Sequence, residues 1–133
     1  MQFTALMLGD SNMRGAFSTL PSGLRTGLSA ALTLAYDVTF VGGSVDAGGL
    51  HHEGHDGWDV ENVISAVIPM LRTYRPNIVG LTIGTNNLCS TDSERYTTPE
   101  VKLAGLLGLM LEVSPLTRIV VSTAPPITSA FAY

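Results

Sequence analysis

An apolar run from Phe3 to Leu8 ends abruptly at Gly9-Asp10-Ser11, and this junction constrains the fold more than any other stretch of the chain. A continuous apolar segment of this length, closed by a glycine, predicts a buried strand that stops in a tight turn. The turn presents an acid and a hydroxyl at the carboxyl end of the strand. Ligands of open α/β sheets bind at that end, so we expect Ser11 to belong to the functional site.

The spacing of apolar residues defines the remaining elements. Residues that recur every three or four positions predict helices over 23–36, 59–75 and 98–113. Continuous or β-branched runs predict strands over 37–41, 78–83 and 118–122. The glycine-rich stretch 42–57, which holds all three histidines, is predicted to be a loop. This order predicts one domain over 1–133, with a parallel sheet and helices on both of its faces.

Local signals add detail to the later helices. Pro69 is expected to kink or interrupt the second predicted helix, and Thr98 is expected to cap the third. Gly105 and Gly108 would let the third helix pack closely against the sheet. The face of this helix expected to meet the core carries Val101, Ala104, Leu107 and Leu111. Residues 123–133 show no clear element.

The composition argues against several classes of function. The net charge is −4, with a single lysine and no basic run, so nucleic acid is not an expected partner. Apolar stretches are too short and too broken to span a membrane, and the N-terminus lacks a signal-peptide pattern. Cys89 has no second cysteine with which to pair. Charged residues make up only 14% of the chain, which favours strands buried on both faces, or apolar surface that is covered from outside.

Three polar turns are expected to meet at one edge of the sheet, because the carboxyl ends of parallel strands lie together. Their sequences are GDSN from position 9, HHEGHDGW from position 51 and GTNN from position 84. Each offers a group that acyl transfer needs. A serine hydroxyl can attack a carbonyl once a base removes its proton. A glycine-rich turn lets a backbone N–H approach the developing oxyanion, and the side chain of Asn86 can donate a second hydrogen bond to it.

These turns, in this order and with two of them directly after apolar strands, resemble the first three blocks of the SGNH, or GDSL-type, hydrolases. The strings HEGHDGW from position 52, TYRPN from position 73 and IGTN from position 83 resemble one branch, carbohydrate esterase family 3, the acetyl xylan esterases. The resemblance implies a three-layer α/β/α sandwich with a parallel, flavodoxin-like sheet and no cofactor. It implies Ser11 as nucleophile, and an oxyanion hole of the Ser11 and Gly57 N–H groups and the Asn86 side chain. The implied substrate is a small-molecule or carbohydrate acyl ester.

The chain departs from the family pattern at two places. Asn87 stands where the family usually has Asp, in a supporting position. The family's base is a histidine in a C-terminal Asp-x-x-His block, and no histidine follows His55. The resemblance therefore implies a fold without its last βα unit and an impaired catalyst; it would imply secretion only for a full-length member. Geometry decides whether His51, His52 or His55 can replace the base.

The same residues also have structural interpretations. Asp10 is expected to hold its turn by hydrogen bonding, and Asn86 could do the same for its own turn. Gly57 could simply start a helix, and Trp58 favours packing over sugar stacking. His55 and the glutamate at position 53 are expected to hold the loop in shape, since the histidines lack the spacing of zinc ligands.

Two other functions compete with the esterase hypothesis. One is a non-catalytic carbohydrate- or acyl-binding domain that keeps the pocket but lacks the base. The other is a receiver or flavin module of the flavodoxin type, for which GDSNMRG supplies neither an acidic cluster nor a convincing phosphate cradle. Acyl specificity, compartment and oligomeric state stay open.

Overall fold

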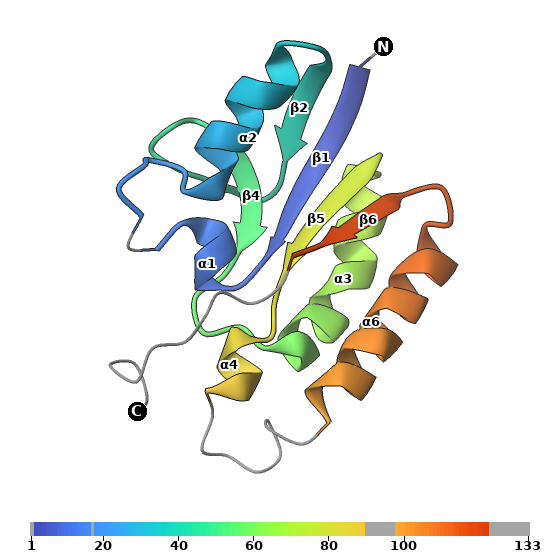
Figure 1. Cartoon of the computed structure of the whole chain (residues 1–133). Helices are drawn as coiled ribbons and strands as arrows, with labels where there is room; N and C mark the ends of the chain where they lie inside the picture. The colour runs from blue at the N-terminus through green and yellow to red at the C-terminus, as the bar shows by residue number, and fades with distance from the viewer. Residues whose placement is uncertain (1, 17, 90–97, 123–133) are drawn as a thin grey trace.

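A computed structural model describes residues 2–16, 18–89 and 98–122. Its strands are β1 (Gln2–Gly9), β2 (Asp37–Val41), β3 (Ser44–Val45), β4 (His51–Gly54), β5 (Ile78–Thr82) and β6 (Arg118–Val121). Its helices are α1 (Ser11–Arg14), α2 (Leu24–Thr33), α3 (Val60–Tyr74), α4 (Thr85–Leu88) and α6 (Pro99–Val113). Figure 1 shows their arrangement.

The strands form one six-stranded sheet around β1. β1 is parallel to β5 on one edge, and β5 is parallel to β6. On its other edge β1 pairs with two strands in succession. β2 runs beside residues 2–6 and β4 beside residues 8–9, both parallel to β1. Only the short β3–β4 pair is antiparallel among the described pairings, so the predicted parallel sheet is confirmed.

The predicted loop over 42–57 is wrong in part, because it contains β3 and β4. β4 is a run of two histidines, a glutamate and a glycine, which carries no β-branched or alternating signal. Its first two residues pair with β3 and its last two with residues 8–9 of β1, so β4 forms through strand pairing, in part with a strand distant in sequence.

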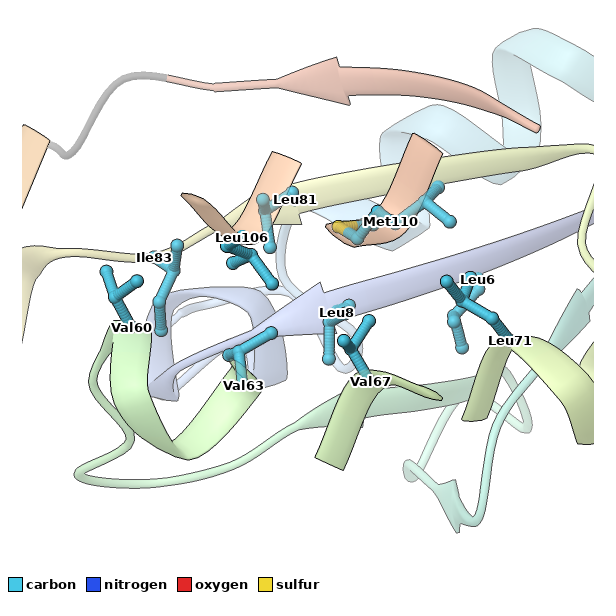
Figure 2. Close-up of a cluster of buried hydrophobic side chains, with 11 residues drawn as sticks. Leu6, Leu8, Val60, Val63, Val67, Leu71, Leu81, Ile83, Leu106 and Met110 are labelled. Atoms are coloured by element: carbon cyan, nitrogen blue, oxygen red, sulfur yellow. The ribbon is translucent and has the colours of Figure 1, made fainter. Parts of the chain in front are cut away.

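Helices lie on both faces of the sheet (Figure 1). α3 and α6 cover one face, and β1 turns Leu6 and Leu8 toward it (Figure 2). The fully buried side chains of this core are Leu6, Leu8, Val60, Val63, Val67, Val79, Leu81, Leu106 and Met110, with Leu71 nearly so. The alternate residues of β1, Ala5 and Met7, join a smaller cluster on the α2 side. The layered α/β/α class predicted from the sequence is confirmed.

The second face carries an apolar groove beside α2. Its volume is about 480 Å³, and residues of β1, α2, β5 and β6 line it. Val120 of β6 lies in this lining and is 61% exposed. No helix of the described residues is long and apolar enough to cross a membrane.

Helix α3 begins at a reciprocal cap and runs through Pro69. Asp59 accepts a hydrogen bond from the backbone N–H of Asn62, whose side chain accepts one from the N–H of Asp59. This capping box stabilises the first turn. The helix continues to Tyr74, so Pro69 does not interrupt it, and the alternative expectation of a kink stays a prediction.

Helix α6 presents a different face from the one predicted. Leu106 and Met110 are buried, whereas Val101 is 62% and Leu111 is 50% exposed. Thr98 precedes the helix with a positive φ and makes no side-chain capping bond, so the predicted cap is wrong. The helix is apolar on nearly every side, and such a sequence carries no single stripe to define its orientation.

Gly105 and Gly108 are exposed, and a β-carbon at either position would have no atom within 4 Å. The predicted close packing is therefore wrong. We expect Gly105→Ala and Gly108→Ala each to raise the free energy of unfolding by about 0.5–1 kcal/mol, because alanine loses less backbone entropy in a helix. Urea unfolding measures this. A loss of stability in both variants would contradict the exposed placement.

Candidate active site

The register of the sheet brings the three predicted turns together at the carboxyl ends of β1, β4 and β5. Gly9 at the end of β1 pairs with Gly54 of β4 on one side and with Thr82 of β5 on the other. The turns that contain Ser11, Gly57 and Asn86 follow within four residues of these partners. Figure 1 shows α1 and α4 beside each other at this carboxyl end.

Backbone hydrogen bonds join the turns directly. The N–H of His55 donates to Gly9 O at 2.9 Å, and the N–H of Asp10 donates to Thr82 O at 3.2 Å. An ion pair between Arg14 Nε and Asp56 Oδ1, at 2.6 Å and largely exposed, adds a contact between the first two turns. The first turn is thus bonded to the second turn and to the end of β5, from which the third turn follows.

Ser11 opens the short helix α1 and is half-buried. Asp10 caps this helix, because its Oδ1 accepts hydrogen bonds from the backbone N–H of Asn12 at 2.9 Å and from Asn12 Nδ2 at 3.1 Å. Burial raises the pKa of Asp10 despite these bonds. Asp10 therefore holds the turn, as its structural interpretation expected.

Asn12 also connects the first turn to the third. Its Nδ2 donates to Thr85 Oγ1 at 3.2 Å. This bond fixes the start of α1 relative to α4, which carries Asn86. The sequence analysis did not single out Asn12 or Thr85. Their only signal is that each lies next to a predicted site residue in a polar turn.

Gly57 and Asn86 lie at the second and third turns. Gly57 is exposed with φ +75°, a conformation that favours glycine, and a β-carbon there would have no atom within 4 Å. The Nδ2 of Asn86 donates to Trp58 O at 2.7 Å. An amide nitrogen carries two N–H donors, so this contact leaves one donor for a ligand. Asn86 thus bonds the neighbouring turn rather than its own.

Asn87 is buried and supports the start of α3. Its Oδ1 accepts a hydrogen bond from Val60 N–H at 3.1 Å, and its Nδ2 donates to Glu61 Oε2 at 3.0 Å. An aspartate here would place a second carboxylate against Glu61. The departure from the family pattern therefore fits the local charge, and Glu61 also pairs with Lys102.

All three histidines hydrogen-bond partners other than Ser11 within the described residues. His51 Nδ1 lies 3.0 Å from Gly42 O. His52 is buried and its Nδ1 accepts from the N–H of Gly54 at 3.0 Å, and burial lowers the pKa of His52. His55 Nε2 lies 2.8 Å from Glu53 Oε2. No group of three or more metal-ligating side chains occurs in the described part of the chain.

A buried ion pair between Arg25 and Asp46 holds the C-terminal end of α1. Arg25 of α2 is fully buried and donates to the carbonyl oxygens of Met13 and Arg14, at the end of α1, and to Asp46 Oδ2 at 2.6 Å. Asp46 also accepts from the N–H groups of the loop that leads to β4. This pair could not be expected from the sequence, because a charged residue in an amphipathic helix normally faces solvent.

We expect Asp46→Asn to lower the free energy of unfolding by about 2 kcal/mol at pH 7. Burial acts to raise the pKa of Asp46, but its hydrogen bonds, first of all from Arg25, hold it at about 2. Because this pKa lies below the value in the unfolded chain, the stabilisation is present above about pH 4 and is lost as the pH falls toward 2.

Urea titrations of the native chain and Asp46→Asn at pH 7 and pH 3 test this expectation. Asp37→Asn, at the exposed start of β2, is the matched control and should change stability by less than about 0.5 kcal/mol. A deficit in Asp46→Asn that is equal at both pH values would contradict the charge-based explanation.

The chain was compared with known families, sequences and structures. No family profile and no curated protein sequence matches the chain. A family 3 carbohydrate esterase of Clostridium thermocellum superposes with a TM-score of 0.87 at 27% identity, over 98% of this chain and 66% of its own. An acetylxylan esterase of Geobacillus stearothermophilus gives 0.61 at 19%, over 90% and 58%. A GDSL-like lipase of Parabacteroides merdae gives 0.61 at 21%, over 90% and 58%.

The parallel sheet, its two helical layers and these similarities define the fold as that of the SGNH, or GDSL-type, hydrolases. Within this class the chain is similar to carbohydrate esterases of family 3. It spans 58% to 66% of the length of the three structures named above.

Proposed function

We propose that this chain carries the nucleophile and oxyanion hole of an SGNH-type serine esterase that acts on short acyl esters, in particular acetyl esters of carbohydrates. The observation that carries the proposal is the set of hydrogen bonds that joins the Ser11, Gly57 and Asn86 turns at one edge of the sheet. The similarity to a family 3 carbohydrate esterase supports the substrate class.

In this proposal the oxygen of Ser11 attacks the ester carbonyl carbon while a base takes its proton. The carbonyl oxygen becomes an oxyanion, which accepts hydrogen bonds from the N–H groups of Ser11 and Gly57 and from the Asn86 side chain. The bond to the alcohol then breaks as the base returns the proton to the departing oxygen, which leaves an acyl-serine; water hydrolyses the acyl-serine, releases the acid and restores Ser11. Asp10, His55, Trp58 and Asn87 support these groups.

The histidines fit supporting roles better than the role of the base, because none of their hydrogen bonds within the described residues is made with Ser11. A nucleophile and its base act as a unit, and loss of either costs about 10⁶ in kcat in a comparable serine hydrolase. The chain and its Ser11→Ala variant should therefore hydrolyse p-nitrophenyl acetate equally slowly in plain buffer.

Added imidazole supplies the base and makes the test decisive. We expect the imidazole-dependent rate of the native chain to saturate with substrate and to exceed that of Ser11→Ala. The variant under identical conditions corrects for hydrolysis by imidazole itself. Superimposable rates at every imidazole concentration would contradict a Ser11 mechanism.

Because the described hydrogen bonds of the histidines are made with partners other than Ser11, a second candidate is also favoured, a carbohydrate- or acyl-binding domain. Trp58 is the only tryptophan and follows Gly57, so its fluorescence reports ligand at the site. Titration with an acetylated xylooligosaccharide, with the deacetylated sugar as control, distinguishes the candidates. Saturable binding without any imidazole-dependent turnover would support the binding domain instead of the esterase.

A further inference from the structure

Glu53 is a buried carboxylate that the proposed chemistry does not use. It lies in β4 and is 5% exposed. Its Oε1 accepts hydrogen bonds from the N–H of Gly43 at 2.6 Å and from the hydroxyl of Tyr74 at 2.7 Å. Its Oε2 lies 2.8 Å from His55 Nε2. A carboxylate this buried requires such partners, and they come from three separate segments of the chain.

The contacts continue from His55 to the third turn. The imidazole of His55 stacks on the indole of Trp58, with ring centroids 3.9 Å apart and planes inclined by 21°. The carbonyl oxygen of Trp58 accepts the hydrogen bond from Asn86 Nδ2. A continuous path of contacts therefore leads from Glu53 to the amide of Asn86.

The carbonyl oxygen of Trp58 fixes the orientation of the Asn86 side-chain amide. A carbonyl oxygen can only accept, so Trp58 O selects the orientation in which the NH₂ group of Asn86 is directed toward it. The reversed amide would set two oxygens against each other and would turn an acceptor, rather than a donor, toward a ligand. The position of Trp58 thus controls whether the site can stabilise a negative charge.

We propose that Glu53 is a positioning residue, which holds His55 and, through the stacked Trp58, the donor orientation of Asn86. Its other partners tie this arrangement to rigid elements, since Tyr74 ends α3 and Gly43 follows β2. Burial acts to raise the pKa of Glu53, but the hydrogen bonds from Tyr74, Gly43 and His55 hold it below its usual value, which keeps the group a charged acceptor. The link to catalysis rests on the proposed function.

NMR and fluorescence of the intact chain test the proposal without an activity assay. The side-chain amide signals of Asn86, assigned by their absence in Asn86→Asp, report its bond to Trp58. Fluorescence of Trp58, the only tryptophan, reports the stacked imidazole. In Glu53→Gln we expect the Asn86 amide protons to exchange about tenfold faster, as for the loss of one hydrogen bond, with a change in Trp58 emission. Glu100→Gln, an exposed acid in the first turn of α6, is the control and should change neither signal.

Tyr74→Phe removes only the hydroxyl donor to Glu53 and should change both signals in the same direction but less. It decides the outcome where Glu53→Gln does not fold. Folded variants with unchanged Asn86 exchange and Trp58 emission would overturn the proposal, and so would unfolding of both, which indicates a purely structural role. A positive result with no Ser11-dependent turnover in the presence of imidazole would keep the positioning role and reject the esterase, so the two failures are distinguishable.

Discussion

Gly9→Ala is expected to destabilise the chain by more than about 4 kcal/mol, enough to prevent folding of a domain of ordinary stability. A β-carbon at this position would lie 1.9 Å from Thr82 O and 3.1 Å from Met13 Cβ. The first of these is a backbone atom of β5, and it accepts the hydrogen bond from Asp10 N–H. Relief of the clash would separate β1 from β5 at the point where the site forms.

Gly27→Ala is the matched control for this expectation. Gly27 lies in α2, is exposed, and would have no atom within 4 Å of its β-carbon. The variant should be more stable than the native chain by about 0.5–1 kcal/mol. Circular dichroism and urea unfolding of both variants make the comparison. A Gly9→Ala variant as stable as the native chain would contradict the observed pairing of β1 with β5.

Leu8→Ala is expected to lower the free energy of unfolding by about 3–5 kcal/mol. Leu8 is fully buried and projects from β1 between the sheet and α3 (Figure 2). Truncation removes its transfer free energy and leaves a cavity, because the strand and helix are fixed by their own hydrogen bonds and cannot close over it.

Leu116→Ala makes the same chemical change on the surface. Leu116 is 94% exposed, so its truncation should alter stability by less than about 0.5 kcal/mol. Urea unfolding at a single pH measures both variants. If Leu8→Ala cost no more than Leu116→Ala, the core described between β1 and α3 would be incorrect.

Much of the fold could be predicted from the sequence. The strand over 37–41 and the capped helix that starts after Asp59 agree with β2 and α3, because their signals are local. The α6 face could not be predicted, since an apolar residue occupies almost every side of that helix. β4 could not be predicted either, because its own residues carry no strand signal and it forms by pairing with β3 and with the end of β1.

Some residues of the candidate site could be selected from the sequence, and others could not. Ser11 and Asn86 were selected from polar turns after predicted strands and Gly57 from a glycine-rich predicted loop, and their proposed roles stay predictions. Asn12 and Thr85, which bond two of these turns, could not be selected, because the bond joins residues 73 positions apart.

The amino-acid sequence alone was enough to place β1, β2, β5, β6 and the three longer helices, the polar turns that follow β1 and β5, and the resemblance to the SGNH hydrolases, because these depend on residues near one another in the chain. The partners of these residues became known from the three-dimensional structure. It showed that Arg25 is buried against α1, that the histidines bond partners other than Ser11, and that Glu53 connects to Asn86. Such contacts depend on strand register and helix packing, which no local pattern encodes.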